Sequence, residues 1–362
     1  MEPIKHIMNK NNKIKVIVVG CGHMGASHAR AYHSIKGFEL AALVAPTPTR
    51  RIPLAKEIGT VPQFDNFDDA LDATSPQAVS INSYTDTHAE YVLKSLKAGL
   101  HVFVEKPIAE TIEQAKKIAD LAKEKNLKVV VGYILRHHPA WMKFIEIAHT
   151  LGKPLVMRMN LNQQSCAEHW QVHKNLMLST SPIVDCGVHY VDVMCQMTRS
   201  KPVQVQAIGA RLSDEIAESM YNYGQLQVVF EDDSVGWYEA GWGPMMSETA
   251  FFVKDCIGPK GSVSIMEATS DSANIDRHTQ TNALLKHDAR LDSDGKFKNK
   301  DIIINTSDEP DHQKLCDREQ QFFLKAIRED LDLSEHLDDA VNSLCIVLAA
   351  DKSIKTGQVI KL

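Results

Sequence analysis

The sequence predicts two domains: an α/β domain on a parallel, doubly wound sheet, then an α+β domain with a large, mostly antiparallel open sheet. A chain of 362 residues exceeds what one hydrophobic core ordinarily serves. Early in the chain, short β-branched runs alternate with helical patterns, whereas later β-type runs follow one another across turns. We expect a flexible tail over 1–13, the first domain over 14–134 and the second over 135–362.

The elements of the first domain follow from these runs. The predicted strands are Ile14–Val19, Glu39–Val44, Ala78–Ile81, His101–Val104 and Lys128–Val131. The predicted helices are His23–Ile35, Thr87–Lys97 and Ile112–Lys125. Strands separated by helices need crossover connections, so this sheet should be parallel with right-handed connections.

The second domain has a different order of predicted elements, in which most strands follow one another directly. Its predicted helices are Pro139–His149, Ile183–Met197, His312–Ile327 and Leu337–Ile354. Its predicted strands are Leu155–Leu161, Val203–Ala210, Gln225–Phe230, Ser234–Glu239, Ala250–Cys256, Ser262–Ile265 and Val359–Leu362. The turn at 231–234 indicates a hairpin, which favours antiparallel pairing. The polar stretch Asn162–Lys174 is predicted to be a loop, and Thr269–Lys300 a loop or weak strands.

Composition excludes several classes of protein. Hydrophobic residues make up 44% and charged residues 24%, as in water-soluble globular proteins, and the net charge of −6 makes a nucleic-acid partner unexpected. No run reaches the roughly 18 apolar residues of a membrane span, and the first residues lack the apolar region of a secretory signal. Seven cysteines without C-x-x-C spacing indicate reduced thiols, so we expect a cytoplasmic protein. Because the sequence also contains no HExxH motif, we expect no bound metal.

A glycine-rich turn, GCGHMG, directly follows the first predicted strand and begins the first predicted helix. In this context the glycines allow a tight turn, close approach of the backbone to a pyrophosphate, and close packing of helix on strand. The helix N-terminus then offers unpaired N–H groups to phosphate. The pattern predicts a dinucleotide site rather than a plain connection, with contacts from Gly20, Gly22, His23, Met24 and Gly25.

The end of the second strand bears on which dinucleotide binds. NAD-specific sites carry an acidic residue about 20 residues after the turn, where this chain has Ala45. Without a carboxylate, nothing repels a 2′-phosphate, and Thr47 with Arg50 or Arg51 could bind one. NADP(H) is therefore favoured and NAD(H) is the alternative, in which the arginines are merely solvated charges.

Two further motifs make the pattern specific. Glu105, Lys106 and Pro107 end the fourth strand as E-K-P, and D-x-G-x-H-x-x-D occupies 185–192. Together with the glycine turn, they resemble the glucose–fructose oxidoreductase / inositol dehydrogenase / MocA family. The resemblance implies a Rossmann domain followed by a domain with an open sheet, acting on a secondary alcohol or ketone of a sugar or cyclitol. It also implies a homodimer or homotetramer.

The resemblance implies roles for particular residues. Lys106 matches the catalytic lysine, and Asp185 and His189 match the dyad on a helix. His88 matches the histidine that begins the helix after the third strand, but Tyr84-Thr85-Asp86 replaces the usual Thr-Pro-Asn. The remaining cofactor contacts expected on these loops come from Ser83, Tyr84, Glu105 and Lys106.

The chemistry of these residue types agrees with those roles. Alcohol oxidation needs a group that takes the hydroxyl proton while hydride leaves the same carbon, and histidine titrates near working pH. His189 lies four residues after Asp185 and three before Asp192, so on a helix all three share one side, where a carboxylate can orient the imidazole. Lys106 can stabilise developing charge on oxygen, and we expect its peptide bond to Pro107 to be cis. Taken singly, each residue could equally be structural: a helix cap, a core histidine or a surface lysine.

Substrate contacts are expected beside the dyad. Trp170, His173 and Lys174 could hydrogen-bond and stack on a polyol together with Lys106, Asp185 and His189, or the loop could be simply solvated. Arg136 is a weaker candidate, and the aromatic run 237–243 better suits a sheet surface or subunit interface.

Three functions fit these residues. The first is an NAD(P)-dependent sugar or cyclitol dehydrogenase. The second is a redox-neutral NAD-dependent glycosidase of the same family, and the third is a cofactor-binding regulator without turnover. The presence of Lys106, Asp185 and His189 argues against the regulator, because a pure sensor needs no proton relay.

Overall fold

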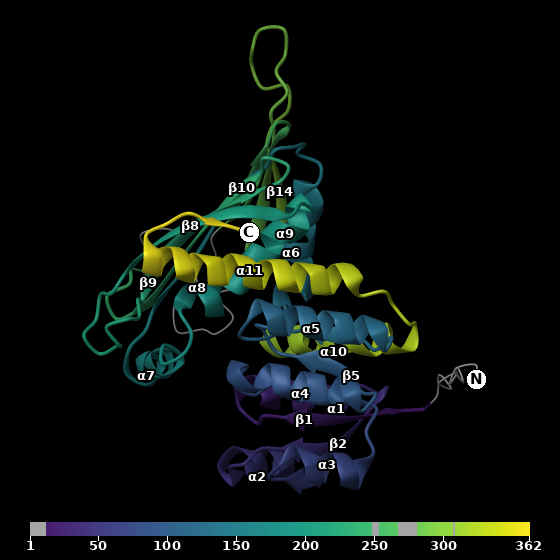
Figure 1. Ribbon diagram of the computed structural model, residues 1–362. Helices are drawn as coiled ribbons and strands as arrows, with labels where there is room; N and C mark the ends of the chain where they lie inside the picture. The colour runs from purple at the N-terminus through teal and green to yellow at the C-terminus, as the bar shows by residue number, and fades with distance from the viewer. Residues whose placement is uncertain (1–11, 248–252, 267–280, 307) are drawn as a thin grey trace. The chain divides into compact units, whose positions relative to one another are not determined.

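The computed structural model describes residues 12–247, 253–266, 281–306 and 308–362, and it forms two compact units (Figure 1). The first unit comprises Met1–Gly132 and Gln313–Val341, and the second comprises Tyr133–His312 and Asn342–Leu362. This differs from the expected single boundary after residue 134, because a segment near the C-terminus returns to the first unit. Most of the expected tail lies outside the described residues, as do parts of the expected strand at 250–256 and of the stretch at 269–300.

The first unit contains a six-stranded sheet in the order β3-β2-β1-β4-β5-β6, with every pairing parallel. The strands are β1 (Ile14–Val19), β2 (Phe38–Val44), β3 (Gln63–Phe64), β4 (Ala78–Ile81), β5 (His101–Val104) and β6 (Val129–Val131). The predicted doubly wound parallel sheet is confirmed. The strand order reverses between β1 and β4, and ligands of such sheets bind at the carboxyl ends of the strands at this point.

Five helices connect the strands of this sheet. They are α1 (His23–Ser34), α2 (Pro48–Glu57), α3 (Phe67–Thr74), α4 (Thr85–Lys97) and α5 (Ile112–Glu124). The sequence analysis missed β3, α2 and α3. Two prolines lie within α2, and α3 has only eight residues, so neither shows a clear helical period.

The returning segment consists of α10 (His312–Arg328) and the first part of α11 (Ser334–Thr356). Phe323 of α10 is fully buried in the core of the first unit, with its ring 6.1 Å from Phe38 and 6.3 Å from Phe103. Burial of a side chain of this size contributes about 1.5–3 kcal/mol. This packing assigns α10 to the first unit.

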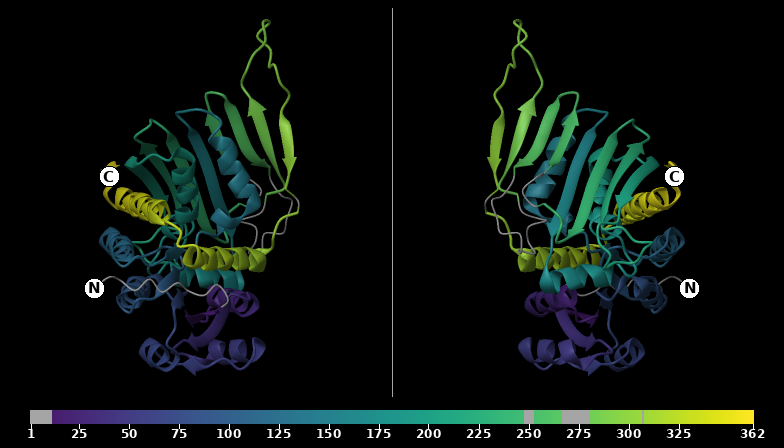
Figure 2. Two further views of the ribbon diagram at one scale, coloured as in Figure 1. Left: turned by 90° about the vertical axis from the view of Figure 1, so that its right-hand side faces the viewer. Right: turned by 90° about the vertical axis from the view of Figure 1, so that its left-hand side faces the viewer.

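The second unit contains a nine-stranded sheet in the order β14-β13-β12-β11-β7-β10-β9-β8-β15, which Figure 2 shows as a broad curved layer. Its strands are β7 (Val156–Gln164), β8 (Pro202–Ala210), β9 (Tyr223–Phe230), β10 (Val235–Gly243), β11 (Lys254–Gly258), β12 (Gly261–Met266), β13 (Ala283–Asp288), β14 (Ile302–Asn305) and β15 (Ile360–Lys361). Only β7 and β10 pair in parallel. The mostly antiparallel sheet is confirmed, as is the hairpin that joins β9 to β10.

Helical segments precede and follow β7. They are η1 (Ile134–His137), α6 (Pro139–Ala148), α7 (Ala167–Leu176), α8 (Pro182–Asp185) and α9 (Gly187–Thr198). The prediction of a loop over 162–174 was wrong, because β7 continues to Gln164 and α7 follows. The single helix predicted over 183–197 was also wrong. It breaks at Cys186, where the His189 N–H bonds to the carbonyl three residues back rather than four.

Two further expectations concern the whole chain. In the ranges that the structure describes, no helix combines the length and apolar character needed to cross a bilayer. The structure has all seven cysteines as free thiols.

Candidate active site

The glycine turn joins β1 to α1, and its three glycines have different surroundings. Gly20 has a φ of +86°, and a Cβ there would lie 2.5 Å from the Asn82 carbonyl oxygen. A Cβ on Gly25 would lie 1.9 Å from the Gly20 carbonyl oxygen. At Gly22 a Cβ would meet only the Arg50 guanidinium, 3.8 Å away. The backbone of the turn thus requires glycine at positions 20 and 25, whereas glycine at position 22 leaves room for a ligand beside the turn.

The N-terminus of α1 presents backbone donors at this open position. Gly22 is the N-cap and provides no side-chain hydrogen bond, and the first helical bond runs from the Ala26 N–H to the Gly22 carbonyl, at 2.9 Å. His23 and Met24 form the first positions of the helix. Uncapped N–H groups at the positive end of a helix bind phosphate. The residues present therefore fit the pyrophosphate of a dinucleotide.

The two arginines after β2 are placed differently. Arg51 is buried, and its guanidinium donates to the carbonyls of Ala45 and Phe64 and pairs with Asp65. It thereby fastens the end of β2 to β3. Arg50 and the N-cap residue Thr47 are exposed on the side of the turn. Of the two candidate arginines, Arg50 is the one positioned beside Gly22.

The loop after β4 forms the opposite side of the turn. Asn82, which the sequence analysis missed, donates its backbone N–H to Val19 at 2.7 Å, and its side chain bonds to Ser80. The Ser83 hydroxyl is 2.6 Å from that of Thr87, and Tyr84 is 80% exposed. The signal for Asn82 was its place directly after a buried strand next to the turn.

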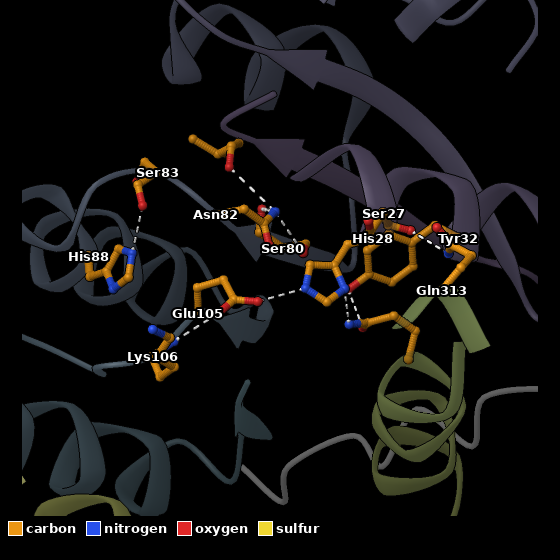
Figure 3. Close-up of polar contacts among 12 residues, drawn as sticks. Ser27, His28, Tyr32, Ser80, Asn82, Ser83, His88, Glu105, Lys106 and Gln313 are labelled. Atoms are coloured by element: carbon orange, nitrogen blue, oxygen red, sulfur yellow. Dashed lines mark hydrogen bonds and ion pairs between the residues drawn. The ribbon is translucent and has the colours of Figure 1, made fainter. Parts of the chain in front are cut away.

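His88 is buried and links two loops. Its Nδ1 is 2.8 Å from the Pro107 carbonyl. Its Nε2 is 3.0 Å from the Ser83 carbonyl, a contact that Figure 3 shows. Burial lowers the pKa of this imidazole, opposed mainly by these two hydrogen bonds. Both ring nitrogens face backbone oxygens, so His88 holds the two loops in place.

Lys106 follows β5 and is anchored by its neighbour Glu105. The Lys106 N–H donates to Glu105 Oε2 at 3.2 Å, and Glu105 Oε1 lies 2.8 Å from His28 Nε2 (Figure 3). Burial acts to raise the pKa of Glu105, but the His28 hydrogen bond and the charges of His28, Lys106 and His88 outweigh it and lower the pKa. The Lys106–Pro107 peptide bond is cis, as expected. An ionised, buried Glu105 thus sets the backbone at Lys106.

The dyad residues lie in the second unit, on either side of the break at Cys186. Asp185 ends α8, and its Oδ2 accepts a weak hydrogen bond from Cys186 Sγ at 3.7 Å. His189 lies in the first turn of α9, is buried, and packs edge-on against Tyr133 at 6.1 Å. The break places Asp185 and His189 on two consecutive helices, α8 and α9.

The last residue of the D-x-G-x-H-x-x-D motif has a structural role. Asp192 is fully buried, and its carboxylate accepts two hydrogen bonds from Arg136, at 2.9 and 2.5 Å, and one from Gln196 at 2.9 Å. This bidentate pair binds η1 to α9. Arg136 is therefore held in the protein interior rather than offered to a ligand.

Two of the three candidate substrate residues of α7 share a carboxylate, and the third stacks on a tryptophan. The indole N–H of Trp170 donates to Glu215 Oε1 at 3.1 Å, and Lys174 Nζ is 2.6 Å from Glu215 Oε2. His173 stacks on Trp242 with ring centroids 4.5 Å apart and an interplanar angle of 8°. Since Trp242 also donates to Gln163 at 2.8 Å, aromatic and amide groups gather here.

His173 should make the stability of the folded chain depend on pH. Burial lowers its pKa from 6.5 to about 4, with Asp185 opposing and His169 adding to the shift. Between pH 6.5 and 4 the unfolded chain binds a proton that the folded chain refuses, so stability falls as pH falls through this window. A His173→Gln variant should lose less stability than wild type between pH 7.5 and pH 5, measured by urea unfolding. His33→Gln, at an exposed position, is the control.

Family models match both parts of the chain. A model described as an oxidoreductase family with an NAD-binding Rossmann fold matches residues 14–133. The GFO/IDH/MocA C-terminal domain matches residues 145–263. The chain belongs to this oxidoreductase family. The resemblance inferred from the three motifs is confirmed, and the family is one of oxidoreductases.

Individual relatives that the chain resembles are named dehydrogenases. UDP-N-acetylglucosamine 3-dehydrogenase of Acidithiobacillus ferrooxidans is 30% identical over 192 residues, which are 53% of this chain and 56% of that protein. The scyllo-inositol 2-dehydrogenase (NAD(+)) of Bacillus subtilis is 24% identical over 97% of both chains. The structure of scyllo-inositol dehydrogenase from Lactobacillus casei with NAD(H) and scyllo-inositol has a TM-score of 0.76 at 21% identity, covering 97% of this chain and 99% of that one. The structural likeness shows a shared fold.

Proposed function

We propose that the chain moves hydride between nicotinamide and a secondary alcohol or ketone of a sugar, sugar derivative or cyclitol. The observation that carries the proposal is Lys106, anchored through Glu105 at the carboxyl end of β5 in the same unit as the open glycine turn. The relatives named above act on hydroxyl groups of cyclitols and of a nucleotide sugar. Asp185 and His189 supply the proton-transfer groups that such chemistry needs.

The nicotinamide, when bound, accepts or returns the hydride. Lys106 donates a hydrogen bond to the substrate oxygen and stabilises the charge that develops there. His189 takes the hydroxyl proton during oxidation and returns it during reduction, and Asp185 favours the protonated imidazole. Gly20, Gly22 and Gly25 hold the pyrophosphate, with Ser83 and Tyr84 on the facing loop.

We propose further that NADP(H) is preferred. Ala45 places no carboxylate at the end of β2, and Arg50 lies beside Gly22 on the exposed side of the turn. A guanidinium there can form charge-assisted hydrogen bonds with a 2′-phosphate, and Thr47 can add a hydroxyl. Arg51 supports this site indirectly by fastening β2 to β3.

This preference predicts the behaviour of two variants. Arg50→Ala should raise the Kd for NADP⁺ by about 10- to 100-fold, the loss of one or two charge-assisted hydrogen bonds, and leave the Kd for NAD⁺ nearly unchanged. Ala45→Asp should shift the preference toward NAD⁺, because a carboxylate repels the 2′-phosphate. Titration of each nucleotide by protein fluorescence measures both effects. An Arg30→Ala variant, which removes a partly exposed arginine of α1, is the control. A wild type that strongly prefers NAD⁺ would contradict the role of Arg50.

For the substrate, we propose that Trp170, His173 and Lys174 contact a polyol. Indole and imidazole faces stack on the apolar face of a sugar ring, while lysine and amide groups bind hydroxyls. A screen of inositols, sugars and sugar derivatives with NAD⁺ and NADP⁺ in parallel, read by absorbance of the reduced nicotinamide, tests the proposed function. Glycoside cleavage without net reduced nicotinamide would favour the redox-neutral glycosidase, and binding without turnover would favour the regulator.

A further inference from the structure

A buried polar cluster lies in the first unit where α1, β5 and α10 meet. His28 comes from α1, and Cys316 and Glu319 lie one helical turn apart on α10. All three side chains are at most 1% exposed. One potential ligand atom from each lies within 4.8 Å of the other two. Three metal-ligating residue types from two segments far apart in the sequence thus converge in the protein interior.

Glu319 makes this cluster unusual. Both of its carboxylate oxygens are buried, and neither has a hydrogen-bond partner among the described residues. Burial, followed by the charge of Glu105, raises the pKa of Glu319 well above its ordinary value. An unpaired carboxylate in such a place costs several kcal/mol and therefore requires a proton or a cation. Both oxygens of Glu319 are thus available to a cation that replaces the proton.

His28 is oriented as a metal-binding histidine is. The Gln320 side-chain oxygen accepts from the Tyr32 hydroxyl, so the Gln320 amide nitrogen, 2.9 Å from His28 Nδ1, donates to that nitrogen. His28 Nε2–H then donates to Glu105 Oε1 at 2.8 Å. The lone pair is on Nδ1, and the other nitrogen is held by a carboxylate, as is usual for histidines that bind zinc. A metal ion at Nδ1 would replace the Gln320 amide.

We propose that His28, Cys316 and Glu319 bind a structural divalent transition-metal ion, with Zn²⁺ the best match. Zinc takes nitrogen, thiolate and carboxylate ligands in tetrahedral sites at about 2.0–2.3 Å, so bound ligand atoms lie roughly 3.3–3.6 Å apart. The ligand atoms of the three side chains must therefore approach one another by up to about 1.5 Å. Binding releases one proton from the Cys316 thiol and one from the Glu319 carboxyl, so the two new negative charges balance the ion. The ion would clamp α10 to α1.

The test uses the full chain, stripped with chelator and then incubated with Zn²⁺. We expect one zinc per chain after gel filtration, measured by plasma mass spectrometry, and an unfolding temperature about 5–10 °C higher than that of the stripped chain. Replacement by Co²⁺ should give a thiolate-to-cobalt charge-transfer band. Because metal content and spectra need no turnover, failure here is distinct from failure of the proposed dehydrogenase activity.

Variants locate the ion. Cys316→Ser and Glu319→Gln should lose the bound zinc and the thermal shift, and Cys316→Ser should also lose the cobalt band. Cys166→Ser, which removes an exposed cysteine, should keep all three and serves as the control. Two results would overturn the proposal: wild type that takes up no zinc, with Glu319 simply protonated, or zinc that stays bound in both α10 variants as an adventitious ion only. The cobalt spectrum of wild type decides the matter even if a variant folds poorly.

Discussion

Lys106→Ala is expected to lower kcat by about 10²- to 10⁴-fold, the usual contribution of a positioned proton-transfer or charge-stabilising group. The variant removes the ammonium but leaves the backbone N–H that Glu105 holds. Cofactor affinity should therefore change by less than about threefold, because the lost interaction acts mainly in the transition state. Steady-state kinetics with a substrate found in the screen, together with nucleotide titration, separates the two effects.

Two comparisons sharpen this prediction. Lys97→Ala, at an exposed lysine of the same unit, should leave kcat unchanged. His189→Ala should lower kcat to a similar degree and flatten its pH dependence, whereas His149→Ala, at an exposed histidine of the second unit, should not. A Lys106→Ala enzyme that keeps full kcat would remove Lys106 from the catalytic group.

Replacing two glycines of the same turn by alanine should affect two different properties: Gly25→Ala the stability of the chain and Gly22→Ala its affinity for the cofactor. At Gly25 the new Cβ would lie 1.9 Å from the Gly20 carbonyl oxygen, so the turn must distort. We expect Gly25→Ala to lower the free energy of unfolding by about 1–3 kcal/mol or more. At Gly22 the nearest neighbour of a Cβ is the flexible Arg50 side chain, 3.8 Å away, so stability should be retained. Gly22→Ala should instead weaken cofactor binding at least about tenfold, because the methyl group occupies the approach of the pyrophosphate.

Urea unfolding and nucleotide titration of both variants give the comparison directly. Gly59→Ala is a further control, since a Cβ there has open space but a φ of +90°, so only backbone strain is added. If Gly22→Ala bound both nucleotides as tightly as wild type, the glycine turn would not be the phosphate site.

The sequence predicted best what local pattern determines. The bounds of β1, β4 and β5 were predicted to the residue, because buried β-branched runs ending at glycine or polar residues have little other interpretation. The helix α7 was missed because its only buried residue is Trp170, so it shows no apolar face. The break at Cys186 was missed because the apolar pattern runs through it, from Ile183 to Met197, without a proline or glycine kink signal strong enough to mark it.

The candidate site was predictable where a motif carries it and not where the fold assembles it. The glycine turn and E-K-P are continuous stretches, so they could be found. His28 supports Glu105 across two elements, and Glu319 reaches the same place from α10 near the other end of the chain. No spacing rule connects such residues. Sequence position alone likewise could not reveal the partners of Arg51, which are Ala45, Phe64 and Asp65.

The central claim is hydride transfer from a substrate carbon to nicotinamide, and isotope transfer tests it most directly. A cyclitol or sugar that gives turnover would be labelled with deuterium at the oxidised carbon and incubated with the enzyme and oxidised nucleotide. We predict one deuterium on C4 of the reduced nicotinamide for each ketone formed, detected by mass spectrometry and NMR. Lys106→Ala should transfer at least about 10²-fold less deuterium in the same time. Product without deuterium on the nucleotide, or with the label returned to the product, would contradict a dehydrogenase that transfers hydride and releases reduced cofactor.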